Sequence, residues 1–173
     1  MPSDINNRSP GYFIACALQR CECCCNLTRV VGLVLPAGHE TLEDVEDSLS
    51  EGRDEDVWET ANRGAILFDV EYLPDTVQTR LHQLSQHYCR DFSEATGSSN
   101  WMNHCSFCGA QQADFDVYCE PEGAFMPISA EAAKKIWLHE VPEPFAAQAT
   151  GYAYAPEFIE YAQVSDNGPG CCT

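Results

Sequence analysis

Cys21-Glu22-Cys23-Cys24-Cys25-Asn26 lies between two apolar runs, and Cys105-Ser106-Phe107-Cys108-Gly109 repeats its pair of cysteines three positions apart. Thiolates hold zinc at the corners of a tetrahedron, with Zn–S bonds of about 2.3 Å. Two cysteines at this spacing can form one edge of the tetrahedron across a tight turn, and a second pair completes it. The sequence therefore predicts one structural Zn²⁺ per chain, held by Cys21, Cys24, Cys105 and Cys108.

The runs around each pair predict β-hairpins. Tyr12–Leu18 and Leu27–Leu35 are apolar, and the second run is rich in valine, so they are the expected arms of a first hairpin. Trp101–His104 is the expected first arm of a second hairpin. Asp114–Cys119 is its expected return arm, because apolar and polar residues alternate there. Gly109 supplies the freedom to adopt a positive φ that a metal-binding turn needs. Each pair is therefore expected to form a zinc knuckle.

The sequence between the two pairs predicts further elements. Ala65–Tyr72 has the composition of a strand, and Pro74 is expected to open a helix that runs roughly to Asp91. Residues 40–59 are dense in aspartate and glutamate, so we expect a short amphipathic helix over 41–50 and an exposed loop beyond it. After the second pair, a capped helix over 129–136 and a strand over 136–141 are expected.

Together these elements predict an α+β fold. Two β-hairpin zinc knuckles would form a split zinc ribbon, with a long helix and an acidic segment inserted between them. The chain has 173 residues, which suits one domain, expected over residues 12–163. Residues 1–11 and 164–173 are expected to be flexible termini.

Composition restricts the environment and the partners. The longest apolar run, Val30–Leu35, is too short to cross a membrane, and the N-terminus does not resemble a signal peptide, so we expect a cytoplasmic protein. In a reducing compartment the 11 cysteines indicate metal binding before disulfides. The net charge of −18 disfavours direct binding to nucleic acid or to anionic membranes. The simplest interpretation of this charge is a solvated acidic surface, and the more specific one is a surface for a protein partner of basic character.

Other uses of the cysteines remain open at this stage. A thioredoxin-type role would place one thiol at a helix N-terminus, whereas strands are expected to flank both pairs. The same four thiolates could instead bind an iron–sulfur centre. His104 or His139 could replace a cysteine and create an open, catalytic site. Cys23 and Cys25 are expected to be spare thiols, since a pair such as Cys21 and Cys23 has poorer geometry.

The cysteine segments also resemble a known pattern. Cys21–Val30 is similar to the opening "CWxCGxxTxV" of a group of uncharacterised bacterial zinc-ribbon-like proteins, and Trp101–Gln111 is similar to their closing element "NxCxxCGAxQ". Asp114-Phe115 and Glu120–Phe125 resemble the "GDF…EPGGPF" stretch that follows it. The resemblance implies the same four cysteine ligands and no particular activity. Glu22 and Cys25 depart from the pattern, which usually has an aromatic residue and a glycine there.

The function expected from these observations is non-catalytic. Four thiolates would close the coordination sphere, so we expect a zinc-binding protein-interaction module. A sharper version is an acidic inhibitor of bacterial or phage origin that mimics nucleic acid and blocks a basic partner. The alternative is an enzyme of unrecognised type, with a cleft near His104, His139 and Glu140.

Overall fold

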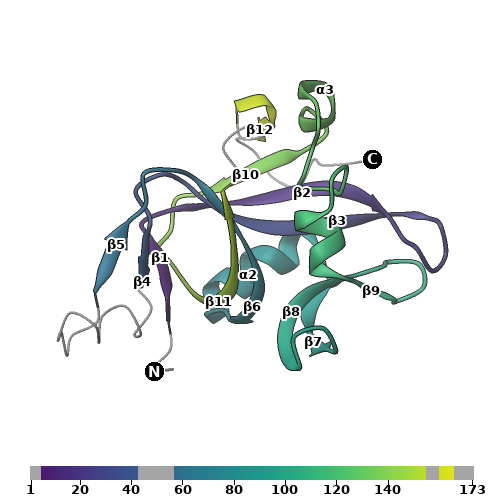
Figure 1. Cartoon of the computed structure of the whole chain (residues 1–173), viewed down its shortest axis with the longest axis horizontal. Coiled ribbons are helices and arrows are strands. Elements are labelled where there is room, and N and C mark those ends of the chain that lie inside the picture. The colour runs from purple at the N-terminus through teal and green to yellow at the C-terminus, as the bar shows by residue number, and fades with distance from the viewer. Residues whose placement is uncertain (1–4, 43–56, 155–159, 166–173) are drawn as a thin grey trace.

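The fold is built on a twelve-stranded sheet that curls around the long strands β2 and β3 (Figure 1). The computed structural model describes residues 5–42, 57–154 and 160–165. The strands are β1 (Asn7–Ser9), β2 (Tyr12–Arg20), β3 (Leu27–Leu35), β4 (Glu40–Leu42), β5 (Trp58–Thr60), β6 (Ala65–Tyr72), β7 (Tyr88–Ser93), β8 (Ser98–His104), β9 (Gln111–Gln112), β10 (Trp137–Val141), β11 (Phe145–Tyr154) and β12 (Gln163–Ser165). The helical segments are α2 (Asp75–Leu84), the π-helical turn η1 (Phe115–Cys119) and α3 (Ala130–Ala133).

The order of the strands brings the two cysteine segments together. Along the sheet the order is β12-β10-β2-β3-β6-β11-β1-β4-β5, and β8 branches from β6 to pair with β7 and β9. The β10–β12 pair is parallel and the other pairs are antiparallel. The β2–β3 turn and the β8–β9 turn lie at the same end of the molecule (Figure 1).

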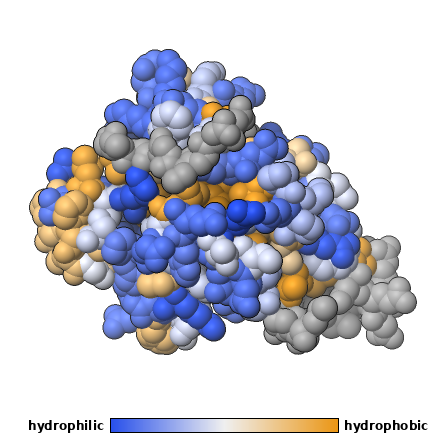
Figure 2. Space-filling view, turned by 180° about the vertical axis from the view of Figure 1, so that it is seen from behind, coloured by the Kyte–Doolittle hydropathy of each residue, from blue (hydrophilic) through white to orange (hydrophobic). Residues whose placement is uncertain are grey.

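Both faces of β2 and β3 are covered, which explains their nearly continuous apolar sequences. Ile14, Val31 and Leu33 point into one cluster of buried side chains, which α2 completes with Val77 and Leu81. The strand residues that alternate with them contribute to a second cluster, among them Ala15, Ala17, Val30 and Val34. η1 adds Val117 and Tyr118 to this cluster, and α3 adds Ala133. Seen from behind, the surface is mostly hydrophilic, with an apolar strip across its middle and a second apolar region at one end (Figure 2).

The first hairpin and the strand at Ala65–Tyr72 are confirmed, but the predicted fold class is wrong. The chain is mostly β, and it is not a small α+β zinc ribbon with a long inserted helix. The predicted helix after Pro74 ends at Leu84, because Ser85 adopts extended backbone angles and Tyr88 then begins β7. Pairing of β7 with β8, which buries Tyr88, outweighs the helical spacing of the apolar residues.

The return arm of the second hairpin is also corrected. Asp114–Cys119 does not form a strand, because Phe115–Cys119 is π-helical and buries the consecutive residues Val117 and Tyr118. The strand that returns from the second cysteine pair is the two-residue β9. The helix predicted over 129–136 is shorter, Ala130–Ala133, and Ser129 caps it as expected by accepting a hydrogen bond from Ala132 N.

The ends of the chain differ from the expectation where the structure describes them. Within residues 1–11, Asn7–Ser9 forms β1, which pairs with β11 and β4. Within 164–173, residues 164 and 165 belong to β12. The helix expected over 41–50 lies outside the described residues, apart from residues 41 and 42, which belong to β4. Among the described helices, none has the length and apolar character needed to traverse a bilayer.

Candidate metal centre

Both cysteine pairs lie in turns with the same hydrogen-bond pattern. In the first turn, Cys25 N donates to Cys21 O at 2.8 Å and Cys21 N donates to Asn26 O at 2.9 Å. In the second, Gly109 N donates to Cys105 O at 2.9 Å and Cys105 N donates to Ala110 O at 2.8 Å. The turns therefore present their two thiols in equivalent ways.

The equivalence extends to the backbone angles. The fourth residue after the first cysteine has a positive φ in each turn, 61° at Cys25 and 76° at Gly109. Glycine adopts this conformation at little energetic cost, whereas a residue with a side chain adopts it less readily. Cys25 thus occupies the position at which the resemblance pattern has glycine, and the first turn keeps its shape despite this departure.

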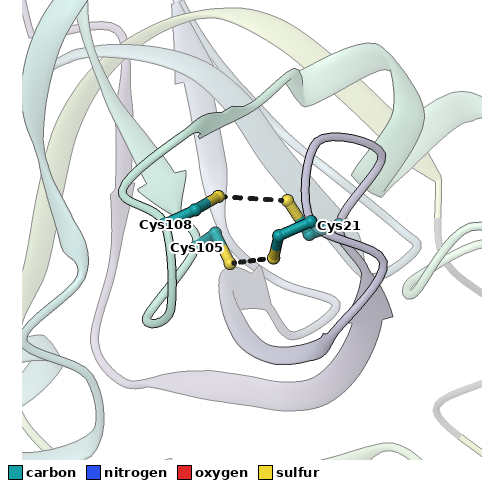
Figure 3. A group of neighbouring side chains, drawn as sticks. Cys21, Cys105 and Cys108 are labelled. Atoms are coloured by element: carbon teal, nitrogen blue, oxygen red, sulfur yellow. Dashed lines mark hydrogen bonds between the residues drawn. The ribbon is translucent and has the colours of Figure 1, made fainter.

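The four predicted cysteines converge. Their sulfur atoms all lie within 4.8 Å of one another. Cys21 Sγ lies 3.7 Å from Cys108 Sγ, and Cys24 Sγ lies 3.6 Å from Cys105 Sγ (Figure 3). A disulfide would bring two sulfurs to about 2.05 Å, so these are thiols and not disulfides. The group can hold one metal ion with ligands from both turns.

Electrostatics also favours a cation between these sulfurs. The backbone N–H of Cys24 lowers the pKa of the Cys21 thiol to about 6, although burial opposes this effect. At Cys108, the backbone N–H of Ala110 lowers the pKa, but burial and the sulfurs of the other three cysteines outweigh it and raise the pKa to about 12. Four thiolates at this separation repel one another, and a bound cation would remove that repulsion.

Polar neighbours support the sulfurs. Asn26 Nδ2 donates to Cys24 Sγ at 3.4 Å, Phe107 N donates to Cys105 Sγ at 3.4 Å, and Gln112 Nε2 lies 3.5 Å from Cys21 Sγ. Such N–H···S contacts orient metal ligands and stabilise their negative charge. Residue types and spacing did not indicate Gln112, although the glutamine that ends the pattern "NxCxxCGAxQ" falls on it.

A direct hydrogen-bonded contact joins the two turns beside the sulfurs. Ser106 N donates to Thr28 Oγ1 at 3.0 Å, and the hydroxyls of these residues are 3.2 Å apart. Thr28 is fully buried. Composition and spacing did not indicate Thr28 either, although the threonine of "CWxCGxxTxV" falls on it.

The remaining thiols of the first turn stay outside the cluster. Cys23 and Cys25 are exposed, and neither belongs to the group of convergent sulfurs. The fold therefore brings Cys24, and not Cys23, together with Cys21 as the second potential ligand of the first turn.

The alternative cleft is not assembled as expected. His139 is buried and Glu140 is exposed, since successive residues of β10 point to opposite faces. Both border a cavity of about 330 Å³ together with Arg80 and Glu143, but His104 does not. The predicted cleft near His104, His139 and Glu140 is therefore not found here, because only His139 and Glu140 border this cavity.

His104 has partners of its own on the neighbouring strand. Its Nε2 lies 3.0 Å from Asp91 Oδ2 and its Nδ1 lies 3.4 Å from Cys89 Sγ. The hydrogen bond from His104, helped by one from Gln111, lowers the pKa of Asp91 to about 2. His104 Nδ1 also faces the His87 carbonyl oxygen at 3.3 Å, and that oxygen can only accept a hydrogen bond. This network holds the His104 side chain, at the end of β8, against β7, and His104 does not belong to the group of four sulfurs.

Comparison with known proteins does not extend this assignment. The chain matches no protein-family model, no curated protein and no solved structure.

Proposed function

We propose that Cys21, Cys24, Cys105 and Cys108 hold one structural Zn²⁺ per chain, and that the body so stabilised is a non-catalytic protein-interaction module. The convergence of four thiols from two equivalent turns carries the proposal. A cytoplasmic location, where thiols remain reduced, is part of it.

The sulfur spacing fits zinc. Tetrahedral zinc with Zn–S bonds of about 2.3 Å has sulfurs about 3.8 Å apart. The two shortest separations here are 3.7 and 3.6 Å. Iron accepts the same four thiolates, so the identity of the metal has to be measured.

Four protein ligands favour a structural role for the metal. Catalytic zinc sites usually keep one position for water or substrate, whereas four thiolates fill the coordination sphere. Cys21 and Cys108 are 87 positions apart in the chain. A shared metal would therefore cross-link the β2–β3 hairpin to the turn between β8 and β9.

Metal analysis of the full chain, purified without added metal, tests the centre. We expect one zinc per chain by mass spectrometry of the elements. After replacement by Co²⁺, we expect the absorption spectrum of a tetrahedral four-sulfur site. A spectrum of mixed nitrogen, oxygen and sulfur ligation, or the absence of stoichiometric zinc or iron, would refute the proposed centre.

The protein-interaction part of the proposal is supported by charge. A net charge of −18 attracts basic surfaces over a range set by the ionic strength. Several described arginines are already engaged, such as Arg8 with Glu40 and Arg20 with the Cys25 carbonyl oxygen. The partner we propose is a basic protein, whose nucleic-acid-binding surface this chain would occupy as a mimic.

Salt dependence and a neutralised variant test this part. Captured basic proteins should be released as the salt concentration rises. Changing the aspartates and glutamates of residues 40–59 to asparagine and glutamine should weaken the capture. The matched control replaces an equal number of exposed acidic residues elsewhere, beginning with Glu94, Glu120, Glu131 and Glu160. Equal capture by the wild type and the 40–59 variant would refute a role for this segment.

A further inference from the structure

A second region of the molecule combines a partly apolar cavity with both lysines of the chain. The cavity has a volume of about 680 Å³ and lies between β2, the segment 122–129, α3 and β10. Ala17, Leu18, Ile128, Ile136 and Trp137 supply apolar surface to its lining. Leu18 and Ile128 are 42% and 66% exposed, so this apolar surface is open to a ligand. A volume of this size, lined by apolar side chains together with a few polar groups, is typical of small-molecule sites.

The charges at this cavity are unusual for the chain. Lys134 and Lys135 are the only two lysines in the sequence, and both border the cavity. Glu122 is the one acidic residue among the lining residues. In a chain with a net charge of −18, both lysines thus lie at one cavity, where Glu131 pairs with Lys134.

The two lysines differ in their partners. Lys134 Nζ donates to Glu131 Oε1 at 2.6 Å, and the backbone carbonyl of Lys134 accepts from Gln163 Nε2. The side chain of Lys135 forms no hydrogen bond or ion pair with any residue that the structure describes, whereas described arginines such as Arg8, Arg80 and Arg90 each do. Its ammonium group is exposed and remains available to a ligand.

We propose that this cavity binds a small apolar carboxylate, with the carboxylate paired to Lys135. The alkyl part of the ligand lies against Leu18, Ile128 and Trp137. The ammonium group of Lys135 favours an anion over a neutral or cationic ligand, and the apolar part of the lining favours an alkyl chain over a compact polar anion. No cysteine of the metal centre borders the cavity, so the inference stands independently of the proposed function.

Paired titrations of the whole chain, as purified, test the proposal. Decanoate and 1-decanol have the same chain length and differ in charge, and calorimetry at physiological ionic strength measures both affinities. We expect saturable binding of one decanoate per chain, roughly three- to fivefold tighter than 1-decanol, as an exposed ion pair of up to about 1 kcal/mol would give.

Variants of the two lysines identify the group responsible. Lys135→Gln should abolish the preference for decanoate and leave the affinity for 1-decanol unchanged. Lys134→Gln is the matched control, because Lys134 is already paired with Glu131, and it should retain most of the preference. Ile128→Asp, which places a carboxylate at an exposed lining position, should weaken decanoate more than 1-decanol and provides a second route should Lys135→Gln fold poorly.

Several outcomes would overturn the proposal. These are no saturable binding of decanoate, equal affinity for decanoate and 1-decanol, or an undiminished preference in both Lys135→Gln and Ile128→Asp. The last would place the ligand elsewhere, for example on the apolar strip of the face shown in Figure 2. A cavity that accepts only a protein segment would give the first outcome.

Discussion

At the scale of single residues, the two cysteine turns differ at Cys25 and Gly109, which occupy equivalent positions. Both have positive φ, so the turn conformation strains Cys25 and suits Gly109. Cys25→Gly should raise the free energy of unfolding by roughly 0.5–1 kcal/mol, and Gly109→Ala should lower it by about as much. Chemical denaturation of the metal-loaded proteins measures both.

Metal content completes the test of this position. Cys25→Gly should keep a full complement of metal, because Cys25 lies outside the group of four sulfurs. Cys23→Ser is the control, since Cys23 is also exposed but has no positive φ. It should change neither metal content nor stability. Loss of metal in Cys25→Gly would show that this thiol is a ligand after all.

Asp114 is a buried carboxyl group whose protonation should affect stability. Burial raises its pKa to about 7, although the backbone N–H of Asp69 donates to its Oδ2 at 2.8 Å and opposes the shift. Its Oδ1 is buried and has no hydrogen-bond partner among the described residues. Since the folded-state pKa exceeds the unfolded value of about 3.9, the folded state binds more protons between these two pH values.

The sign of the pH effect follows from this difference. Stability contributed by Asp114 should fall as the pH rises from about 4 to about 7 and then stay constant. Asp114→Asn should remove this loss, with a gain over the wild type above pH 7 of at most roughly 4 kcal/mol. Denaturant titrations between pH 4 and pH 8 measure it. Glu94→Gln, at an exposed position, is the control, and parallel pH profiles for the wild type and Asp114→Asn would contradict the prediction.

At the scale of secondary-structure elements, Asn103 joins two strands that do not pair directly. Its Oδ1 accepts from Val31 N at 2.9 Å and its Nδ2 donates to Val31 O at 2.9 Å, so its amide substitutes for a strand partner between β8 and β3. Tyr118 Oη also donates to Val31 O, at 2.7 Å. All three residues are buried.

Removing this amide should be more damaging than removing the tyrosine hydroxyl. Asn103→Ala leaves the Val31 N–H buried and unpaired, which should lower the free energy of unfolding by about 2–4 kcal/mol. Tyr118→Phe removes the two hydrogen bonds of the hydroxyl, to Val31 O and from Asn103 Nδ2. Asn103 still pairs with Val31 N and O, so no buried group is left without a partner and the cost should be about 1 kcal/mol. Thermal denaturation compares them, and equal costs would show that the bridge does not connect β8 to β3 energetically.

The sequence predicted the strands that are mostly apolar. β2, β3 and β6 are apolar runs, and the turn residues between β2 and β3 are polar or cysteine, so these strands could be located directly, although β2 continues to Arg20, beyond the predicted end at Leu18. β11 was missed because Phe145–Tyr154 contains four alanines and a glycine, which have low strand propensity, and two prolines precede it. Its place is set by pairing with β6 and β1.

The candidate site was more predictable than the fold around it. The spacing of Cys21 with Cys24 and of Cys105 with Cys108 indicates paired ligands whatever the surrounding architecture, and the sulfurs do converge. Spacing does not indicate Thr28 or Gln112, because their roles depend on how the two turns meet. The conflict at Tyr88, helical by spacing but β by pairing, has the same origin in distant contacts.

At the scale of the whole molecule, the metal should decide whether the sheet holds together. The two turns come from distant parts of the chain and join through the sulfur group and the Thr28–Ser106 contact. Binding of zinc to four thiolates contributes on the order of 10 kcal/mol, and a domain is typically stable by about 5–15 kcal/mol. Without the metal, most of the stability of the fold should therefore be lost.

Chelation and ligand variants measure this dependence. A strong chelator should abolish cooperative thermal unfolding, and Cys105→Ser or Cys21→Ser should give unfolded or aggregated protein with little metal. Cys23→Ser is the matched control from the same turn, because its exposed thiol lies outside the sulfur group. It should keep both metal and cooperativity. If the metal-free protein melted as sharply and at the same temperature as the loaded protein, the packing of β2 and β3 would suffice to hold the fold. The four cysteines would then need a role other than cross-linking.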